Sequence, residues 1–140
     1  MVAQIAAARH AIDFESEELS DAPVYQALAA DARRGVACRI LMMDSSEWDS
    51  AFRTLTRAGC AVRVLHQTAS GLYIHEKLVL DDPGTAHESL LIGSQNASWE
   101  SLHVNRELAL VIGSANGGAA VIRHVGATFQ GDLGAARPWR

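Results

Sequence analysis

The chain has 140 residues and a hydrophobic share of 49%, which is enough for the core of one domain. Its formal charge of −4 makes a non-specific nucleic-acid-binding protein less favoured, because such proteins usually carry a basic stripe. No apolar run approaches the ~18 residues of a membrane span, and the first residues lack the pattern of a secretory leader. The sequence therefore predicts a protein without a transmembrane segment, and a cytoplasmic location. Cys38 and Cys60 belong to no disulfide or metal pattern, so we expect buried thiols.

The first half of the chain alternates helical and strand patterns. We expect a short helix near 2–6, a strand over 11–15, a helix from about 20 to 35, a strand over 36–42, a helix from about 45 to 59 and a strand over 60–65. Asp21 followed by Pro23 is a typical helix start, and Gly35 and Gly59 are typical helix ends. This alternation predicts right-handed crossovers and a partly parallel sheet.

The second half of the chain is different, because its predicted strands follow one another directly. We expect short strands near 73–80, 89–93 and 106–112, then a helix from about 114 to 130 and a loop over 134–140. The sequence as a whole predicts one α/β domain over residues 1–140, with a mixed β-sheet flanked by helices on both faces.

Two polar motifs stand at the predicted strands of the second half. His75, Lys77 and Asp82 have the spacing H-x-K-x4-D, and Gly93-Ser94-Gln95-Asn96 reads G-S-x-N. A lone histidine and lysine on a strand are usually surface residues. Residues two apart on a strand point to the same side, however, and ligand-binding groups of α/β sheets gather where strands end. Taken together, the two motifs predict a catalytic or phosphate-binding site.

These residue types suit the attack on a phosphodiester. Lys77 offers a compact positive charge to a non-bridging oxygen, and Asn96 and Ser94 can donate hydrogen bonds to the same group. Gly93 lets the backbone come close to a ligand without a side chain in the way. His75 can act as a neutral nucleophile near pH 7, which would give a covalent phosphohistidine and split the displacement into two steps.

The two motifs resemble those of the phospholipase D superfamily, whose signature is an H-x-K-x4-D (HKD) motif followed by G-S-x-N. The resemblance implies the mixed-sheet sandwich predicted above and a phosphohistidine mechanism that uses neither a metal nor another cofactor. It assigns Glu107, 11 residues after Asn96, to hold the second ring nitrogen of His75. The alternative for Glu107 is a solvated residue at a strand start. Asp82 is the third letter of the motif, and we expect it to be mainly structural, paired with backbone or with a cation. The adjacent Asp81 is an alternative candidate for this role.

A second G-S-x-N, Gly113-Ser114-Ala115-Asn116, follows another apolar segment. It is far from Asp82 in the sequence and directly precedes the last predicted helix, so Ser114 is better interpreted as a helix cap. Four small polar residues are therefore a weak signal unless an H-x-K-x4-D motif stands nearby.

The chain departs from the family pattern in three respects. The spacer between Asp82 and Gly93 is long, because residues 83–88 extend a hairpin. Family modules open with a strand before the first helix, whereas this chain opens with a helix, so we expect a fragment or a shortened domain that lacks the usual first strand. The chain also carries one HKD motif where the family reaction uses two, which implies a homodimer or a second HKD half.

Several functions fit this sequence. The first hypothesis is a phospholipase D-type phosphodiesterase acting on a phospholipid head group, by hydrolysis or, as in cardiolipin synthesis, by transfer to an alcohol. The alternatives are an HKD endonuclease acting on DNA or RNA and an inactive half-module that binds phosphate or forms dimers. The sequence does not choose the acceptor or the physiological substrate.

Overall fold

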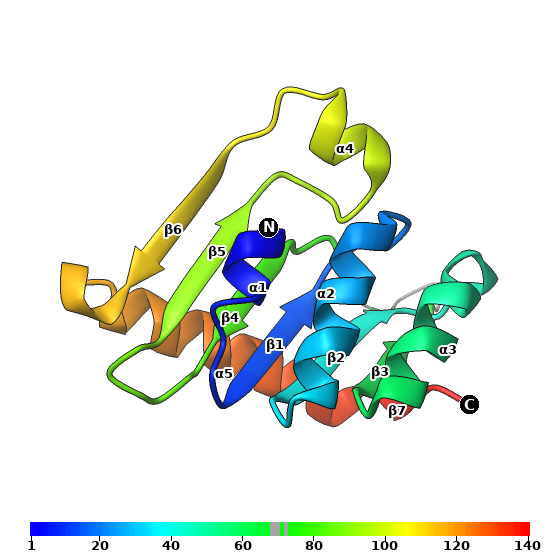
Figure 1. Ribbon diagram of the computed structural model, residues 1–140, viewed down its shortest axis with the longest axis horizontal. Coiled ribbons are helices and arrows are strands. Elements are labelled where there is room, and N and C mark those ends of the chain that lie inside the picture. The colour runs from blue at the N-terminus through cyan, green and yellow to red at the C-terminus, as the bar shows by residue number, and fades with distance from the viewer. Residues whose placement is uncertain (68–70, 72) are drawn as a thin grey trace.

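The computed structural model describes residues 1–67, 71 and 73–140 (Figure 1). The helices are α1 (Val2–Ile5), α2 (Ala22–Arg33), α3 (Asp49–Ala58), α4 (Trp99–His103) and α5 (Ala119–Ala135), with short 3-10 turns at Ser46–Trp48 and Ser114–Asn116. The strands are β1 (Ala11–Glu15), β2 (Ala37–Met43), β3 (Ala61–Leu65), β4 (Leu78–Asp81), β5 (Ser89–Gly93), β6 (Ala109–Gly113) and β7 (Arg137–Pro138).

All seven strands form one mixed sheet in the order β6-β5-β4-β1-β2-β3-β7. The pairs β1–β2 and β2–β3 are parallel, and each is connected by a helix that crosses the sheet. The remaining neighbours, from β1–β4 to β5–β6 and at β3–β7, are antiparallel. The predicted α/β class with a partly parallel sheet is confirmed.

Helices cover both faces of the sheet (Figure 1). On one face, α1, α2 and α3 contribute Ile5, Leu28 and Phe52 to a core shared with Phe14 of β1 and Val79 of β4. On the other face, α5 packs Ile122 and Phe129 against side chains from β2, β4 and β5. Because strand side chains alternate between faces, neighbouring residues of β4 serve different cores: Val79 faces one core, and Leu78 and Leu80 face the other.

The first crossover helix begins, and both crossover helices end, as the sequence predicts. The second was expected to start at Ser45, which instead caps the 3-10 turn at Ser46–Trp48, so that α3 begins only at Asp49. The Asp21 side chain accepts a hydrogen bond from the Val24 backbone N–H at 3.2 Å and thereby caps α2. Gly59 ends α3 in the left-handed conformation, with φ = 103°. Because β1, β2 and β3 are parallel, their carboxyl ends lie together at one end of the sheet, here called the site edge. The opposite strand ends form the far edge.

The strand expected near 73–80 is wrong over residues 73–77, which lie outside the sheet; β4 begins only at Leu78. His75 and Lys77 therefore do not owe their common direction to a strand. They lie in an irregular segment in which the Ile74 N–H contacts Met43 Sδ at 3.4 Å.

The C-terminal expectations also need correction. The last helix begins at Ala119, not near Ser114, because Ser114–Asn116 form a 3-10 turn that Gly117 ends with φ = 81°. Ser114 is thus not the cap of α5, whose capping residue is Gly118. The helix continues to Ala135, and the expected terminal loop contains β7, which pairs with β3. None of the helices in the described part of the chain is long and apolar enough to cross a membrane.

Candidate active site

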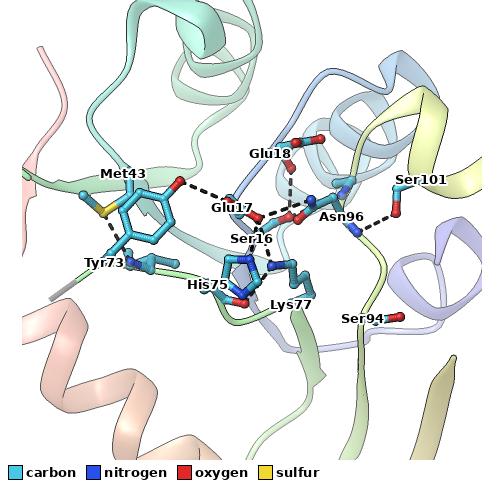
Figure 2. Close-up of polar contacts among 12 residues, drawn as sticks. Ser16, Glu17, Glu18, Met43, Tyr73, His75, Lys77, Ser94, Asn96 and Ser101 are labelled. Atoms are coloured by element: carbon cyan, nitrogen blue, oxygen red, sulfur yellow. Dashed lines mark hydrogen bonds and ion pairs between the residues drawn. The ribbon is translucent and has the colours of Figure 1, made fainter. Parts of the chain in front are cut away.

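Three of the polar side chains singled out in the sequence point at one oxygen atom (Figure 2). The Oε2 atom of Glu17 lies 3.1 Å from His75 Nε2, 3.0 Å from Lys77 Nζ and 3.4 Å from Asn96 Nδ2. The groups come from the segment before β4, from the loop after β5 and, for Glu17, from the loop after β1. Strands of both halves therefore deliver side chains to the same edge of the sheet.

The side chain of Lys77 is only 5% exposed, and its charge is paired. Its ammonium group donates to the carboxylate of Glu17 and to the backbone carbonyl of His75, at 3.0 and 2.8 Å. A buried charge is tolerated only when it is paired and hydrogen-bonded. The side chain of His75, in contrast, is 72% exposed, so its imidazole is open to a ligand.

The loop after β5 needs a glycine at position 93. A Cβ atom at Gly93 would lie 2.2 Å from the carbonyl oxygen of Leu108 and 2.7 Å from Ala109 Cα, which are backbone atoms at the start of β6. The Gly93 N–H donates to the Lys77 carbonyl at 3.3 Å, which ties the end of β5 to the start of β4. The missing side chain thus lets the loop lie against β6, and the hydrogen bond to Lys77 joins the two motifs.

Asn96 is anchored through its backbone. Its N–H donates to Ser101 Oγ at 2.8 Å, while the side-chain Nδ2 reaches Glu17. The side-chain Oδ1 is buried and has no hydrogen-bond partner among the described residues. The amide therefore presents its donor end to the position where the lysine and histidine converge.

Glu17 is the site residue that sequence reasoning missed. Burial raises the pKa of its carboxyl, but hydrogen bonds from Lys77, Tyr73 and Asn96 and the positive charge of Lys77 outweigh burial and lower it. The carboxylate is therefore ionised at neutral pH. The available signal was its position two residues beyond the predicted strand 11–15, because polar residues just after a strand of an α/β sheet gather at the site edge.

Ser94 and Glu107 form a second cluster next to the first. The Ser94 hydroxyl donates to Glu107 Oε2 at 2.5 Å and accepts from the Leu108 N–H at 3.1 Å. The Ser101 hydroxyl donates to the other carboxylate oxygen at 2.6 Å, and the hydrogen bonds from Ser101 and Ser94 lower the pKa of Glu107. The described contacts of Glu107 include no hydrogen bond to His75 of the same chain. Figure 2 shows Ser94 directed away from Lys77.

Asp82 lies at the opposite end of β4 from Lys77, about 16 Å away at ~3.3 Å per strand residue. Its carboxylate accepts from the backbone N–H groups of Arg9, His10 and Ala11, with Oδ1 contacts of 3.1, 2.7 and 3.1 Å. Burial raises the pKa of Asp82, but these backbone hydrogen bonds outweigh it and lower the pKa. The structure therefore places Asp82 as a tie between the end of β4 and the segment that precedes β1.

Asp81, the adjacent carboxyl group, is buried at the same far edge. It accepts a hydrogen bond from Gln4 of α1, while its Oδ1 has no hydrogen-bond partner in the described part of the chain. Burial raises its pKa to about 7. Neither of these two aspartates reaches the cluster at His75.

Space for a ligand lies beside the cluster. A cavity of about 340 Å³ is lined by His75, Lys77 and Gly93 on one side and by His124 and Thr128 of α5 on the other. Within residues 1–67, 71 and 73–140, His, Cys, Asp and Glu side chains form no group of three or more that could hold a metal ion.

Comparison with known proteins identifies the family. A family model described as "Cardiolipin synthase, PLD-like domain" matches residues 1–133, so the chain belongs to the phospholipase D-like family. The curated relative "Phospholipase D Y" from Dictyostelium discoideum is 32% identical over 94 residues, which are 64% of this chain. The match covers only 20% of that relative, so the chain spans about a fifth of its length.

Solved structures show the same fold. Nuc from Salmonella typhimurium, a phospholipase D family member, matches 99% of this chain and 88% of its own with a TM-score of 0.84 at 19% identity. NucT from Helicobacter pylori matches 99% and 87% of the two chains with a TM-score of 0.81 at 18% identity. At these identities the likeness shows the fold alone, and it agrees with the mixed sheet described above.

Proposed function

We propose that this domain is a metal-independent phosphodiesterase of the phospholipase D type that works through a phosphohistidine on His75. The observation that carries the proposal is the convergence of His75 Nε2, Lys77 Nζ and Asn96 Nδ2 on one oxygen position, at 3.0–3.4 Å. A nucleophile, a cation and a neutral donor around one oxygen are the groups that a phosphodiester requires.

In the proposed first step, His75 carries its ring proton on Nδ1 and the free lone pair of Nε2 attacks phosphorus. Lys77 and Asn96 hold a non-bridging oxygen and stabilise the charge that gathers there in the transition state. The bond from phosphorus to the leaving oxygen breaks, and that oxygen takes its electron pair and needs a proton. In the second step, water attacks phosphorus and gives a proton to the group that protonated the leaving oxygen, the phosphorus–nitrogen bond breaks and His75 is restored. An alcohol in place of water would give transfer.

The leaving oxygen needs a proton donor on the side opposite the attacking imidazole. We propose that His75 of a second copy of the chain supplies it in a two-fold dimer; a second HKD half would serve equally. The support is β6, the outermost strand on its side of the described sheet, whose outer side pairs with no other strand. Exposed apolar residues lie in this strand and directly before it. Leu108, Leu110 and Val111 are 74%, 58% and 62% exposed. A bare apolar edge is the kind of surface that associates with another chain.

Ser94 and Glu107 are proposed to act on the loop that carries Asn96. Their mutual hydrogen bond and the Leu108 N–H to Ser94 contact join the end of β5 to the start of β6. The role of Glu107 in holding the second ring nitrogen of His75 stays a prediction. Asp82 is proposed to be structural, because it lies at the far end of β4.

A phospholipid head group is the favoured substrate over a nucleic acid. The chain carries a net charge of −4, and a second cavity beside Glu17, of about 320 Å³, is lined by the further carboxylates Glu18, Asp44 and Glu47. A long polyanion would be repelled there. The names of the curated relative and of the matched family support the same choice.

The test is hydrolysis of bis(p-nitrophenyl) phosphate, phosphatidylcholine and plasmid DNA, with a chelator present, by the wild type, His75→Ala and His87→Ala. His87 lies in the β4–β5 hairpin at the far edge and serves as the matched control. We expect turnover of the lipid by the wild type and His87→Ala and a loss of about 1,000-fold or more in His75→Ala, since the covalent route is removed. Equal rates in all three proteins, or loss of activity in chelator, would contradict the mechanism.

The same proteins report on assembly. Light scattering should give the mass of two chains for an active wild type. An active, persistent monomer would contradict the dimer, and preferential cleavage of DNA would replace the lipid with a nucleic acid as substrate.

A further inference from the structure

The carboxylate of Glu17 stands where the proposed reaction puts a substrate oxygen. Its Oε2 atom contacts His75, Lys77 and Asn96, the three groups assigned to the phosphodiester (Figure 2). The contact with His75 is made at Nε2, the nitrogen that attacks phosphorus, so Glu17 is not an orienting partner on the other ring nitrogen. The carboxylate instead covers the attacking atom.

The position of Glu17 is held from its other side as well. The hydroxyl of Tyr73 donates to Glu17 Oε1 at 3.0 Å, so both carboxylate oxygens are engaged. The side chain is 21% exposed and extends from the loop between β1 and α2. A carboxylate with two defined sets of partners is a built feature of the site and not a freely moving surface residue.

A phosphodiester and this carboxylate cannot both use the position. Each carries one negative charge, and placing them at contact distance around a single ammonium group leaves strong repulsion between them. The carboxylate must therefore move away when a phosphoryl oxygen binds to Lys77. The cavity beside it has room, but Glu18, Asp44 and Glu47 line that cavity, so a displaced carboxylate meets further negative charge.

We propose that Glu17 is an internal anion that occupies the phosphoryl-oxygen position of the free site and determines which anions the site accepts. The inference rests on the proposed function, because it takes His75, Lys77 and Asn96 to be the phosphate-binding groups. An incoming anion must outcompete the carboxylate and then tolerate it nearby. A monoanionic diester meets less repulsion than a dianionic monoester or inorganic phosphate, so Glu17 selects for diesters.

The experiment measures anion binding without turnover. Dimethyl phosphate, a monoanion, and inorganic phosphate at pH 8, mainly a dianion, are titrated into the wild type and Glu17→Gln, and the dissociation constants are obtained by NMR. Glu17→Gln keeps the size of the side chain and removes its charge. We expect about tenfold tighter binding of dimethyl phosphate and a larger gain, about 100-fold, for inorganic phosphate.

Two further variants keep the result interpretable. Glu18→Gln removes the same charge from the next residue, which lines the cavity but contacts none of the three groups, and we expect both dissociation constants to fall by no more than about threefold. Glu17→Asp withdraws the carboxylate by one methylene, and we expect an intermediate gain; it serves if Glu17→Gln does not fold.

The outcomes separate the inference from the proposed function. If the wild type hydrolyses diesters but Glu17→Gln and Glu17→Asp bind both anions no more tightly than it does, the internal anion is overturned and the proposed function stands. Tighter binding in both variants of a protein that hydrolyses no diester supports the anion site and overturns the phosphodiesterase. An equal gain in Glu18→Gln overturns the direct competition in favour of a general charge effect.

Discussion

The two edges of the sheet carry the same four-residue pattern in different surroundings. Gly93-Ser94-Gln95-Asn96 follows β5, and Gly113-Ser114-Ala115-Asn116 follows β6. Because β5 and β6 are antiparallel, the first pattern lies at the edge where His75 and Lys77 are found, and the second lies at the far edge. The first meets the backbone of β6 at close range; a Cβ at Gly113 would have only the Glu88 carbonyl oxygen nearby, at 4.0 Å.

The difference shows that a G-S-x-N sequence takes part in a site only when its strand ends at the site edge, beside the other polar residues. At the site edge the loops after β1 and β5 lie next to the segment before β4. The side-chain amide of Asn96 donates a hydrogen bond to Glu17 there. At the far edge the same residue types form a 3-10 turn that leads into α5. Three predictions test this contrast.

The largest effect is expected from the two glycines. Gly93→Ala should destabilise the fold by about 2–3 kcal/mol, because its Cβ would overlap backbone atoms of β6. Its activity should fall about 100-fold, because displacement of the loop moves Asn96. Gly113→Ala should leave both within error, since φ there is −112° and the space is open. Urea denaturation and diester hydrolysis measure the pair; similar losses in both variants would contradict the contrast.

The second effect concerns carboxyl groups at the two edges. Burial raises the pKa of Asp81, at the far edge, to about 7 from 3.8. Between about pH 4 and pH 7 the unfolded chain loses this proton while the folded protein keeps it. The contribution of Asp81 to the free energy of unfolding therefore falls as the pH rises and is lost above pH 7. Asp81→Asn should therefore be more stable than the wild type at pH 8, on the order of 2 kcal/mol, and similar at pH 4.

Glu107 at the site edge provides the opposite sign. Hydrogen bonds from Ser101 and Ser94 lower its pKa, so its contribution is present above the unfolded pKa and is lost as the pH falls. Glu107→Gln should therefore be less stable than the wild type at pH 8 and approach it at low pH. Denaturant midpoints between pH 4 and pH 8 measure both variants, and parallel curves for the three proteins would rule out this assignment of charges.

The smallest effect is expected from the two serines. Ser94→Ala removes the acceptor of the Leu108 N–H and a donor to Glu107, and should cost about 1 kcal/mol of stability and about tenfold in activity. Ser114→Ala should stay within about 0.5 kcal/mol, because the described hydrogen bond of Ser114 is accepted by its backbone carbonyl. Thermal denaturation and the hydrolysis assay compare the two; a larger loss in Ser114→Ala would reverse the ranking.

The local patterns predicted most of the elements. Alternating residues predicted β1, Asp21 predicted the start of α2, and Gly35 and Gly59 predicted the ends of α2 and α3, because capping and strand alternation depend on neighbours in the sequence. The strand over 73–77 and the helix start at Ser114 were wrong. In both places the sequence has a plausible local pattern, but contacts with distant residues or an interrupting glycine decide the outcome.

The sequence by itself determined the α/β class and the two motifs, because residue types and their spacing are visible along the chain. Only the tertiary structure separated Asp82 from Lys77 at opposite ends of β4, tied Glu107 to Ser94 and Ser101, and placed Glu17 against the attacking nitrogen of His75. The contacts of Glu17 with Lys77 and Asn96 join residues that are 60 and 79 positions apart. They depend on which edge of the sheet each strand reaches, and strand order is decided by the packing of the whole domain.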